Sequence, residues 1–385
     1  MHTLRVAIVA PSLRILGGQA IQADHLLRGW TNDADVRAWL VPINPAPPKY
    51  LRWTRDVKYA RTLVTESMYT SKLLLQLRGA DLVHVFSASY WSFLLAPVPA
   101  IAAAKAMGIP VILNYHSGEA PDHLRRSAVA RAVLARVDRN VVPSGFLVDV
   151  FKDFGIPSTA IGNVVDLGRF QFRERRTFAP RILSTRNFEA LYNVACTIRA
   201  FRRIQDRHPD AALTLVGGGS QERALKTLAA DLNLKNVVFT GRLRPDNVDA
   251  IRPDHDIYLQ SPSIDNMPLS VLEAFATGTP VVTTGVGGIP YMVRHLHNGM
   301  LAPADDDEAL AVHALRLIDE PALGQSIVRN ALSSCEALTW PTLRGQWLGL
   351  YRDVVAAAST RRTFGAASDA SGHVATNPPS GPGES

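Results

Sequence analysis

The segment from residue 261 to 282 reads Ser261-Pro-Ser-Ile-Asp265-Asn-Met-Pro268-Leu-Ser-Val-Leu-Glu273-Ala-Phe-Ala-Thr-Gly278-Thr-Pro-Val-Val. It predicts a loop after an apolar strand, a helix that begins near Pro268, a glycine stop and a further strand. The N-terminus of a helix presents free backbone N–H groups and a positive partial charge, which suit a diphosphate. The carboxylates of Asp265 and Glu273, on either side of that terminus, can bind hydroxyl groups without blocking it.

Short apolar runs alternate with helical stretches on both sides of this segment, which is the pattern of βαβ units and parallel sheets. The runs are continuous, as expected for strands that are buried on both faces. The predicted strands are Leu4–Ala10, Val36–Val41, Leu82–Phe86, Pro110–Asn114, Asn140–Val142, Arg181–Ser184, Ala212–Val216, Asn236–Phe239, Asp256–Gln260 and Pro280–Thr283.

Two such series in a chain of 385 residues predict two domains, because a single hydrophobic core stops growing below that length. We expect two doubly wound parallel-sheet α/β domains, over residues 1–165 and 181–338. Residues 166–180 have little apolar periodicity and are expected to link them.

Large apolar residues recur at spacings of three and four after Trp340, among them Leu343, Trp347 and Tyr351. This spacing predicts an amphipathic helix over 339–358 that docks on another part of the protein. Gly, Ser, Pro and Ala dominate after Thr360, so a disordered tail is expected over 361–385.

The net charge of +7 comes from the first part of the chain: residues 1–170 hold 19 Lys and Arg against 12 Asp and Glu, whereas residues 171–385 hold 22 of each. A basic face favours an anionic partner such as a phosphorylated lipid or a membrane surface, and a solvated surface with a modest surplus is an equal alternative. Residues 49–78 concentrate the charge, with aromatic residues interleaved. They fit an interfacial helix at an anionic membrane or a solvated helix beside an acceptor cleft. No motif indicates nucleic-acid binding, and none is expected.

Cys196 and Cys335 are too few for a disulfide framework and lack metal-ligand spacing. The first residues show no signal-peptide pattern, and no apolar run reaches the ~20 residues that span a bilayer. We therefore expect a cytoplasmic protein, with peripheral contact at the inner membrane face as an open option.

The segment at 261–282 resembles glycosyltransferase family 4, whose hallmark is two acidic residues separated by seven positions, followed by Ala and a Gly-x-Pro strand. Asp265 and Glu273 have that spacing, although the family usually has Glu at the first position. Gly285-Val-Gly-Gly288 resembles the family's glycine-rich loop, but Tyr291 stands where an acidic residue is common. The resemblance implies a GT-B fold, with two Rossmann-like domains facing a central cleft. It implies that residues 1–165 form the acceptor side, that residues 181–338 bind the donor, and that the helix over 339–358 crosses back to the first domain. It also implies no cofactor, because the UDP- or GDP-linked sugar is a substrate.

By this resemblance, Asp265 would bind hydroxyl groups of the donor sugar and Glu273 those of the ribose. The phosphates would be bound by the backbone of Pro268, Leu269 and Ser270.

Arg186 follows a predicted strand, at the place of the first of two cations that the family uses to neutralise the leaving diphosphate. The second, a Lys about five residues on, is missing, because Leu191, Tyr192 and Asn193 stand there. Another cation, such as one from the N-terminal domain, could replace it, or activity is lost; we favour replacement.

Other candidates also lie at predicted strand ends. Gly17 and Gly18 follow the first strand, where a loop can approach a phosphate, although a plain β–α turn is the alternative. The resemblance places His116 near the transferred sugar and Gly217 in a turn at the donor site. It places Arg242 and Leu243 against the base or the phosphates.

Two groups of acids, Asp254-His-Asp256 and Asp305-Asp-Asp307, precede a predicted strand and a predicted helix. Acids before a helix act as caps and complement its dipole. No metal ion is expected.

These observations favour a retaining glycosyltransferase that moves a hexose to a hydroxyl of a glycan, a lipid or a small metabolite. A sugar-nucleotide epimerase of the same architecture is one alternative, and it would need a proton-transfer pair in the cleft. A catalytically inactive scaffold that binds nucleotide sugars is the other, suggested by the missing Lys.

Overall fold

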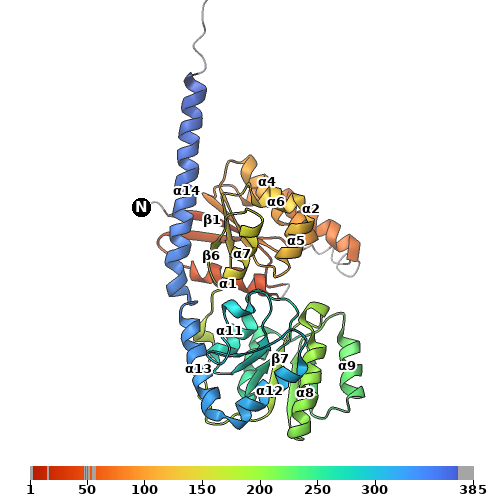
Figure 1. Cartoon of the computed structure of the whole chain (residues 1–385). Coiled ribbons are helices and arrows are strands. Elements are labelled where there is room, and N and C mark those ends of the chain that lie inside the picture. The colour runs from red at the N-terminus through yellow and green to blue at the C-terminus, as the bar shows by residue number, and fades with distance from the viewer. Residues whose placement is uncertain are drawn as a thin grey trace, which may run out of the picture.

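Two parallel sheets of six strands each form the two lobes of the protein (Figure 1). The computed structural model describes residues 3–14, 17–46, 48, 50, 53 and 58–371, with the backbone alone for 58–61 and 362–371. The strand orders are β2-β1-β3-β4-β5-β6 and β12-β11-β10-β7-β8-β9. All pairings between these strands are parallel. The predicted α/β class with two doubly wound parallel sheets is confirmed.

All ten predicted strands are present, with small differences at their ends. The first sheet contains β1 (Leu4–Ala10), β2 (Val36–Pro42), β3 (Leu82–Ser87), β4 (Val111–Tyr115), β5 (Arg139–Val142) and β6 (Thr159–Ala160). The second contains β7 (Arg181–Thr185), β8 (Ala212–Val216), β9 (Val237–Gly241), β10 (Ile257–Leu259), β11 (Val281–Thr284) and β12 (Met300–Ala302). The predicted set leaves out two short edge strands, β6 and β12. Of these, β6 is exposed and carries no apolar run.

Helices cover both faces of each sheet (Figure 1). In the first lobe they are α1 (Gly18–Gly29), α2 (Lys58–Gln76), α3 (Tyr90–Leu95), α4 (Pro97–Ala106), α5 (Ala120–Arg126), α6 (Ala128–Leu134) and α7 (Gly145–Asp153). In the second they are α8 (Val194–Arg207), α9 (Glu222–Asp231), α10 (Pro245–Ile251), α11 (Leu269–Ala276), α12 (Asp307–Asp319) and α13 (Pro321–Glu336). Neighbouring strand residues alternate between faces: Val83 and Val85 belong to one apolar cluster, and Leu82 belongs to the other. This double burial explains the continuous apolar runs.

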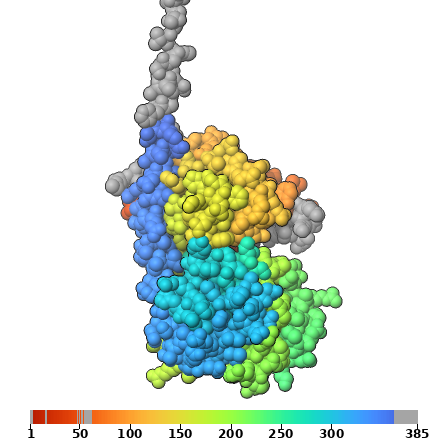
Figure 2. All heavy atoms as spheres, viewed as in Figure 1, coloured from red at the N-terminus to blue at the C-terminus, as the bar shows by residue number. Residues whose placement is uncertain are grey.

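The last helix, α14 (Trp340–Ser371), lies along the first sheet and projects beyond it (Figures 1 and 2). Its buried Trp347 and Tyr351 share an apolar cluster with Ile8 of β1. The Tyr351 hydroxyl lies 2.8 Å from His84 Nδ1. The chain therefore returns to the first lobe after completing the second.

The predicted end of this helix at residue 358 is wrong, because α14 continues to Ser371. Alanines recur from Ala356 onward and no proline interrupts the segment before Pro378. Alanine has the highest helix propensity, and extending a formed helix is easier than nucleating one. Residues 361–371 of the predicted disordered tail are therefore helical, and the rest of that tail, residues 372–385, lies outside the described residues.

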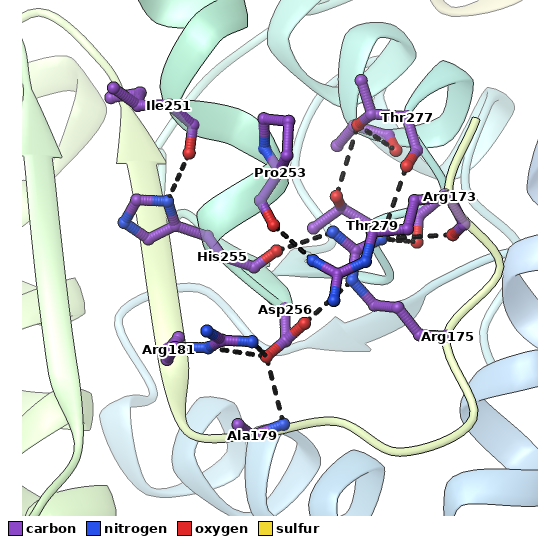
Figure 3. A network of polar contacts seen from close by, with 12 residues as sticks. Arg173, Arg175, Ala179, Arg181, Ile251, Pro253, His255, Asp256, Thr277 and Thr279 are labelled. Carbon is purple, nitrogen blue, oxygen red and sulfur yellow. Dashed lines mark hydrogen bonds and ion pairs between the residues drawn. The ribbon is translucent and has the colours of Figure 1, made fainter. Parts of the chain in front are cut away.

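The connection between the lobes is anchored to the second sheet by Arg175 (Figure 3). This buried guanidinium donates to Asp256 Oδ1 at 2.9 Å, to the His255 carbonyl at 2.7 Å and to the Gly278 carbonyl at 2.6 Å. The other oxygen of Asp256 accepts from Arg181 Nη2 at 2.7 Å. Asp256 thus holds the linker against the sheet, and both of its oxygens are engaged by arginines.

Candidate active site

A cleft of about 890 Å³ lies between the lobes, at the carboxyl ends of both sheets. Arg186 follows β7 and Asp265 follows β10, which are adjacent strands with connections that leave in opposite directions. Ligands of open α/β sheets bind at such a switch point. All the site residues that the sequence predicted line this cleft: Gly17, Gly18, His116, Arg186, Gly217, Arg242, Leu243, Asp265, Pro268, Leu269, Ser270 and Glu273.

Two helices begin at the wall of this cleft. Pro268 is the N-cap of α11, and Gly17 is the N-cap of α1. Neither residue provides a side-chain cap, so the first amides of both helices are left to another acceptor. Both termini direct positive partial charge toward the cleft, which suits an anionic group.

Asp265 forms an ion pair with Arg186 at the second-lobe wall. Arg186 also donates to Ser270 Oγ at 3.3 Å, and its guanidinium lies 4.1 Å from the ring centroid of Tyr192. Burial disfavours the charged form of Arg186 and lowers its pKa. The neighbouring Asp265, Tyr258 and Tyr192 outweigh this effect, so the pKa of Arg186 is raised above its usual value. Arg186 is therefore a fixed, fully charged cation.

Glu273 is bound by Arg252, a residue that the sequence did not single out. Arg252 is 2% exposed, in the short helix η4 (Arg252–Asp254). Its Nε lies 3.7 Å from Asp249, which accepts from Arg169 Nε at 2.6 Å. Arg169, Asp249 and Glu273 all line the cleft. Burial raises the pKa of Glu273, and Arg252 opposes that rise.

No cation replaces the missing Lys within the segment 191–193. Tyr192 lines the cleft beneath Arg186, whereas Asn193 turns away and donates to Asp305 Oδ1 at 2.9 Å. Among the described residues, the cations that line the cleft are Arg14, Arg169, Arg186 and Arg242. Arg169 is paired with Asp249, and Arg242 donates to the Gly218 carbonyl at 3.3 Å. Arg14 is exposed and comes from the β1–α1 loop of the first lobe.

Two family models match consecutive parts of the chain. The model of Glycosyltransferase Family 4 matches residues 16–169, and the model of Glycosyl transferases group 1 matches residues 170–333. The chain belongs to glycosyltransferase family 4. Its resemblance to this family, first seen in the segment 261–282, is confirmed.

Curated relatives of this family 4 chain are about a quarter to a third identical to it over the aligned residues. Glycogen synthase of Mycobacterium tuberculosis is 29% identical over 267 residues, which are 65% of this chain and 63% of the relative. D-inositol 3-phosphate glycosyltransferase of Acidothermus cellulolyticus is 27% identical over 320 residues, 74% of this chain and 69% of the relative. The match thus spans somewhat less than two thirds of the glycogen synthase.

Solved structures confirm the GT-B fold. HepE of Anabaena, solved in complex with UDP and glucose, superposes with a TM-score of 0.71 at 17% identity. The superposition covers 91% of this chain and 100% of HepE. At this identity the likeness concerns the fold alone.

In this family 4 chain, the glycine-rich loop 285–288 packs against the backbone of Asp265 and Asn266. A Cβ on Gly287, whose φ is +54°, would lie 2.1 Å from the carbonyl oxygen of Asp265. A Cβ on Gly288 would lie 2.1 Å from that of Asn266. These glycines touch the backbone that carries Asp265, and they are not among the residues that line the cleft. The lack of a side chain at these positions therefore allows close packing against the loop that carries Asp265.

The first lobe also contacts the loop that carries Asp265. Asn163 Nδ2 donates to the Met267 carbonyl at 3.0 Å, and Ser144 Oγ donates to Asn266 Oδ1. Tyr291, which stands where the family commonly has an acid, donates through its hydroxyl to Asp149 of α7 at 2.5 Å. Tyr291 thus connects the two lobes, and no pattern in the sequence indicated this contact.

His116 lies at the carboxyl end of β4, on the first-lobe wall of the cleft. Its ring is stacked on Phe86 with centroids 5.1 Å apart, and its Nε2 is buried without a hydrogen-bond partner in the described structure. Burial lowers the pKa of His116 to about 4. The imidazole is therefore neutral at pH 7.

The remaining charged candidates do not add a site within the described part of the chain. Asp307 is bound by Arg199 and Arg203, and Asp306 caps α12. No cluster of His, Cys, Asp or Glu among the described residues has the arrangement of a metal site. No helix in the described ranges is long and apolar enough to span a bilayer. Of the basic residues at 49–78, the side chains of Lys49, Arg52, Arg55, Lys58 and Arg61 lie outside the described structure.

Proposed function

We propose that the chain is a retaining glycosyltransferase that moves a hexose from a UDP- or GDP-linked donor to an acceptor hydroxyl. One observation carries the proposal: the uncapped start of α11 lines the cleft between two carboxylates, Asp265 and Glu273. Residues 181–338 would bind the donor, and residues 1–165 would form the acceptor side. HepE and TarM, which share the fold, were crystallised with UDP, which supports a UDP-linked donor.

Three groups of residues would each bind a different part of the donor. The amides of Leu269 and Ser270 would bind the diphosphate at the helix N-terminus. Glu273, held by Arg252, would accept hydrogen bonds from the ribose hydroxyls. Asp265 would bind sugar hydroxyls. Its ion pair with Arg186 would keep that arginine beside the leaving phosphate.

The missing Lys leaves a need for a second positive charge, because Asp265 neutralises much of the charge of Arg186. We propose that Arg14 supplies it. Arg14 lines the cleft from the first lobe and has no ion-pair partner among the described residues. Preorganised charge at the leaving group is usually the largest single contribution to catalysis.

In the proposed reaction the acceptor oxygen bonds to the anomeric carbon as the bond from that carbon to the diphosphate oxygen breaks. The hydroxyl proton leaves with the nucleoside diphosphate. The neutral ring of His116 would hydrogen-bond the transferred sugar through Nε2. Attack would occur on the face from which the diphosphate departs, as the family implies.

An inactive scaffold that binds nucleotide sugars is the second candidate, favoured by the absence of the usual Lys at 191–193. An epimerase is not advanced, because Asp249, Asp265 and Glu273 are each held by an arginine. Peripheral contact with an anionic membrane through the basic N-terminal half is a further proposal. The acceptor class is a glycan, a lipid or a small metabolite.

Thermal-shift measurements with UDP, GDP and their sugar conjugates test the donor site. A ligand that binds only the native state raises the free energy of unfolding by RT ln(1 + [L]/Kd). UDP should raise the melting temperature of the parent more than 2′-deoxy-UDP does, since Glu273 would bind the 2′-hydroxyl. Glu273→Ala should abolish that difference. Equal responses of parent and variant would exclude Glu273 from the ribose site. Product formation across an acceptor panel separates an enzyme from a scaffold.

A further inference from the structure

A second cavity, of about 310 Å³, lies beside the cleft in the first lobe. Gln19 and Ser92 are the side chains with polar groups among its described lining residues. Its apolar wall is formed by Pro11, Ile43, Phe86, Ala88, Ala96 and Pro97. This lining contrasts with that of the adjoining cleft, which includes four arginines and three carboxylates.

The cavity occupies the switch point of the first sheet. Pro11 follows β1, Ile43 follows β2 and Ala88 follows β3, so the cavity lies at the carboxyl ends of these strands. In the order β2-β1-β3 the chain leaves β1 toward one side and later returns on the other. Ligands of open α/β sheets bind in the crevice at this point, which makes the cavity a binding position rather than a packing defect.

The cavity and the cleft share a wall. Gly17, Gly18 and Gln19 line both. Phe86 lines the cavity and is stacked on His116, which lines the cleft and has an unpartnered, buried Nε2. The apolar space therefore meets the cleft beside the residue that we place at the transferred sugar.

Another cavity also borders the cleft. It shares Arg14, Ile21, Arg169 and Pro245 with the cleft, and its own lining includes the charged residues Arg28, Asp166 and Arg244. Charged walls do not suit an alkyl chain, because burying a charge beside an apolar group is costly.

We infer that the apolar cavity binds an alkyl chain carried by the acceptor, so that the acceptor hydroxyl lies beside His116 at the cleft. This inference rests on the proposed glycosyl transfer and narrows the acceptor to a lipid-type molecule. Trp91 and Leu95 of α3 are 75% and 38% exposed, next to Ser92. They extend the apolar surface outward and would contact a chain longer than the cavity.

The test uses the full chain with saturating UDP and n-alkyl β-glucosides of two to eight carbons, below their micelle concentrations, in titration calorimetry. Each buried methylene contributes about 0.8 kcal/mol, which is about a fourfold change in affinity. Affinity should rise by about that factor for each added carbon until the cavity is filled. An affinity independent of chain length would overturn the inference.

Ser92→Asp places a charge in the apolar wall at an exposed position, so the fold should be unaffected. It should weaken octyl glucoside binding at least tenfold and leave the thermal shift with UDP unchanged. Ser326→Asp, an equally exposed change on α13 of the other lobe, is the matched control and should bind like the parent. Unchanged octyl glucoside binding by Ser92→Asp would also overturn the inference. If UDP stabilises the parent but alkyl glucosides do not bind, the inference fails and the donor site stands; if UDP does not stabilise it, the proposed function fails.

Discussion

Asp265 and Arg186 form an ion pair at the wall of the cleft, with 15% and 10% of their side chains exposed. Without a ligand, the Arg186 guanidinium is neutralised by the Asp265 carboxylate and lies over the ring of Tyr192. A diphosphate that binds there must share Arg186 with a carboxylate.

Asp265→Asn keeps the shape of the side chain and removes its charge. The variant should lose about 3 kcal/mol of unfolding free energy without ligand, because the Arg186 guanidinium stays buried and unpaired. A diphosphate would replace the lost charge, so UDP should raise the melting temperature of this variant more than that of the parent. Differential scanning fluorimetry measures both effects. A smaller shift in the variant would mean that Arg186 does not face the phosphates.

Arg14→Ala should lower kcat by about a hundredfold, the cost typical of removing one group that stabilises transition-state charge. Arg14→Lys should recover part of the rate, since it restores the charge without the planar guanidinium. Arg223→Ala, which removes an exposed arginine of α9, is the control for net charge. Steady-state kinetics with the donor found by thermal shift provide the measurement. Equal kcat for Arg14→Ala and Arg223→Ala would show that Arg14 is not the second cation at the leaving phosphate.

The stability of the protein should fall as the pH drops from about 6.5 toward 4. Burial lowers the pKa of His84 to about 3 and that of His116 to about 4, whereas both rings titrate near 6.5 in the unfolded chain. The unfolded state binds more protons in this window, so each ring contributes up to about 1.4 kcal/mol per pH unit. Denaturant unfolding from pH 4 to 7.5 measures the slope.

The slope has its own controls. His84→Gln should flatten it, whereas His297→Gln, at an exposed position, should not. A parent protein whose unfolding free energy is constant from pH 6.5 to 4 would show that these rings titrate normally in the fold.

Gly217→Ala should weaken donor binding by displacing Arg186. A Cβ on Gly217 would lie 2.0 Å from the carbonyl oxygen of Arg186, so the strand end that carries this arginine must move. We expect a loss of about 1–3 kcal/mol in stability, as for other overpacked sites, and a reduced thermal shift with UDP. Gly349→Ala, on α14 with open space around it, should keep the full shift. An undiminished shift in Gly217→Ala would show that the donor does not need Arg186 in this position.

Local patterns in the sequence were sufficient to predict ten of the twelve strands and the start of α11, since burial on both faces leaves continuous apolar runs. Strand-end residues such as His116 and Arg186 could be placed at the cleft, because the carboxyl ends of parallel strands meet at one edge. The pairing of Arg252 with Glu273 and of Tyr291 with Asp149 could not be predicted. Each pair depends on tertiary packing. Glu273 and Tyr291 lie in recognisable segments, but nothing in the sequence around Arg252 or Asp149 marks either residue as the partner.

The parallel bridge between Val165 and Thr339 places the two crossings between the lobes side by side. Beyond it, α14 supplies Leu343, Trp347 and Tyr351 to the same apolar cluster as β1. The first folding unit is therefore discontinuous in the chain: it is assembled from the opening residues and the last long helix. A fragment ending at residue 165 would leave part of one face of its sheet uncovered, because only α1 would remain on the cluster that α14 completes. The first lobe therefore cannot complete its core until synthesis has passed the second lobe.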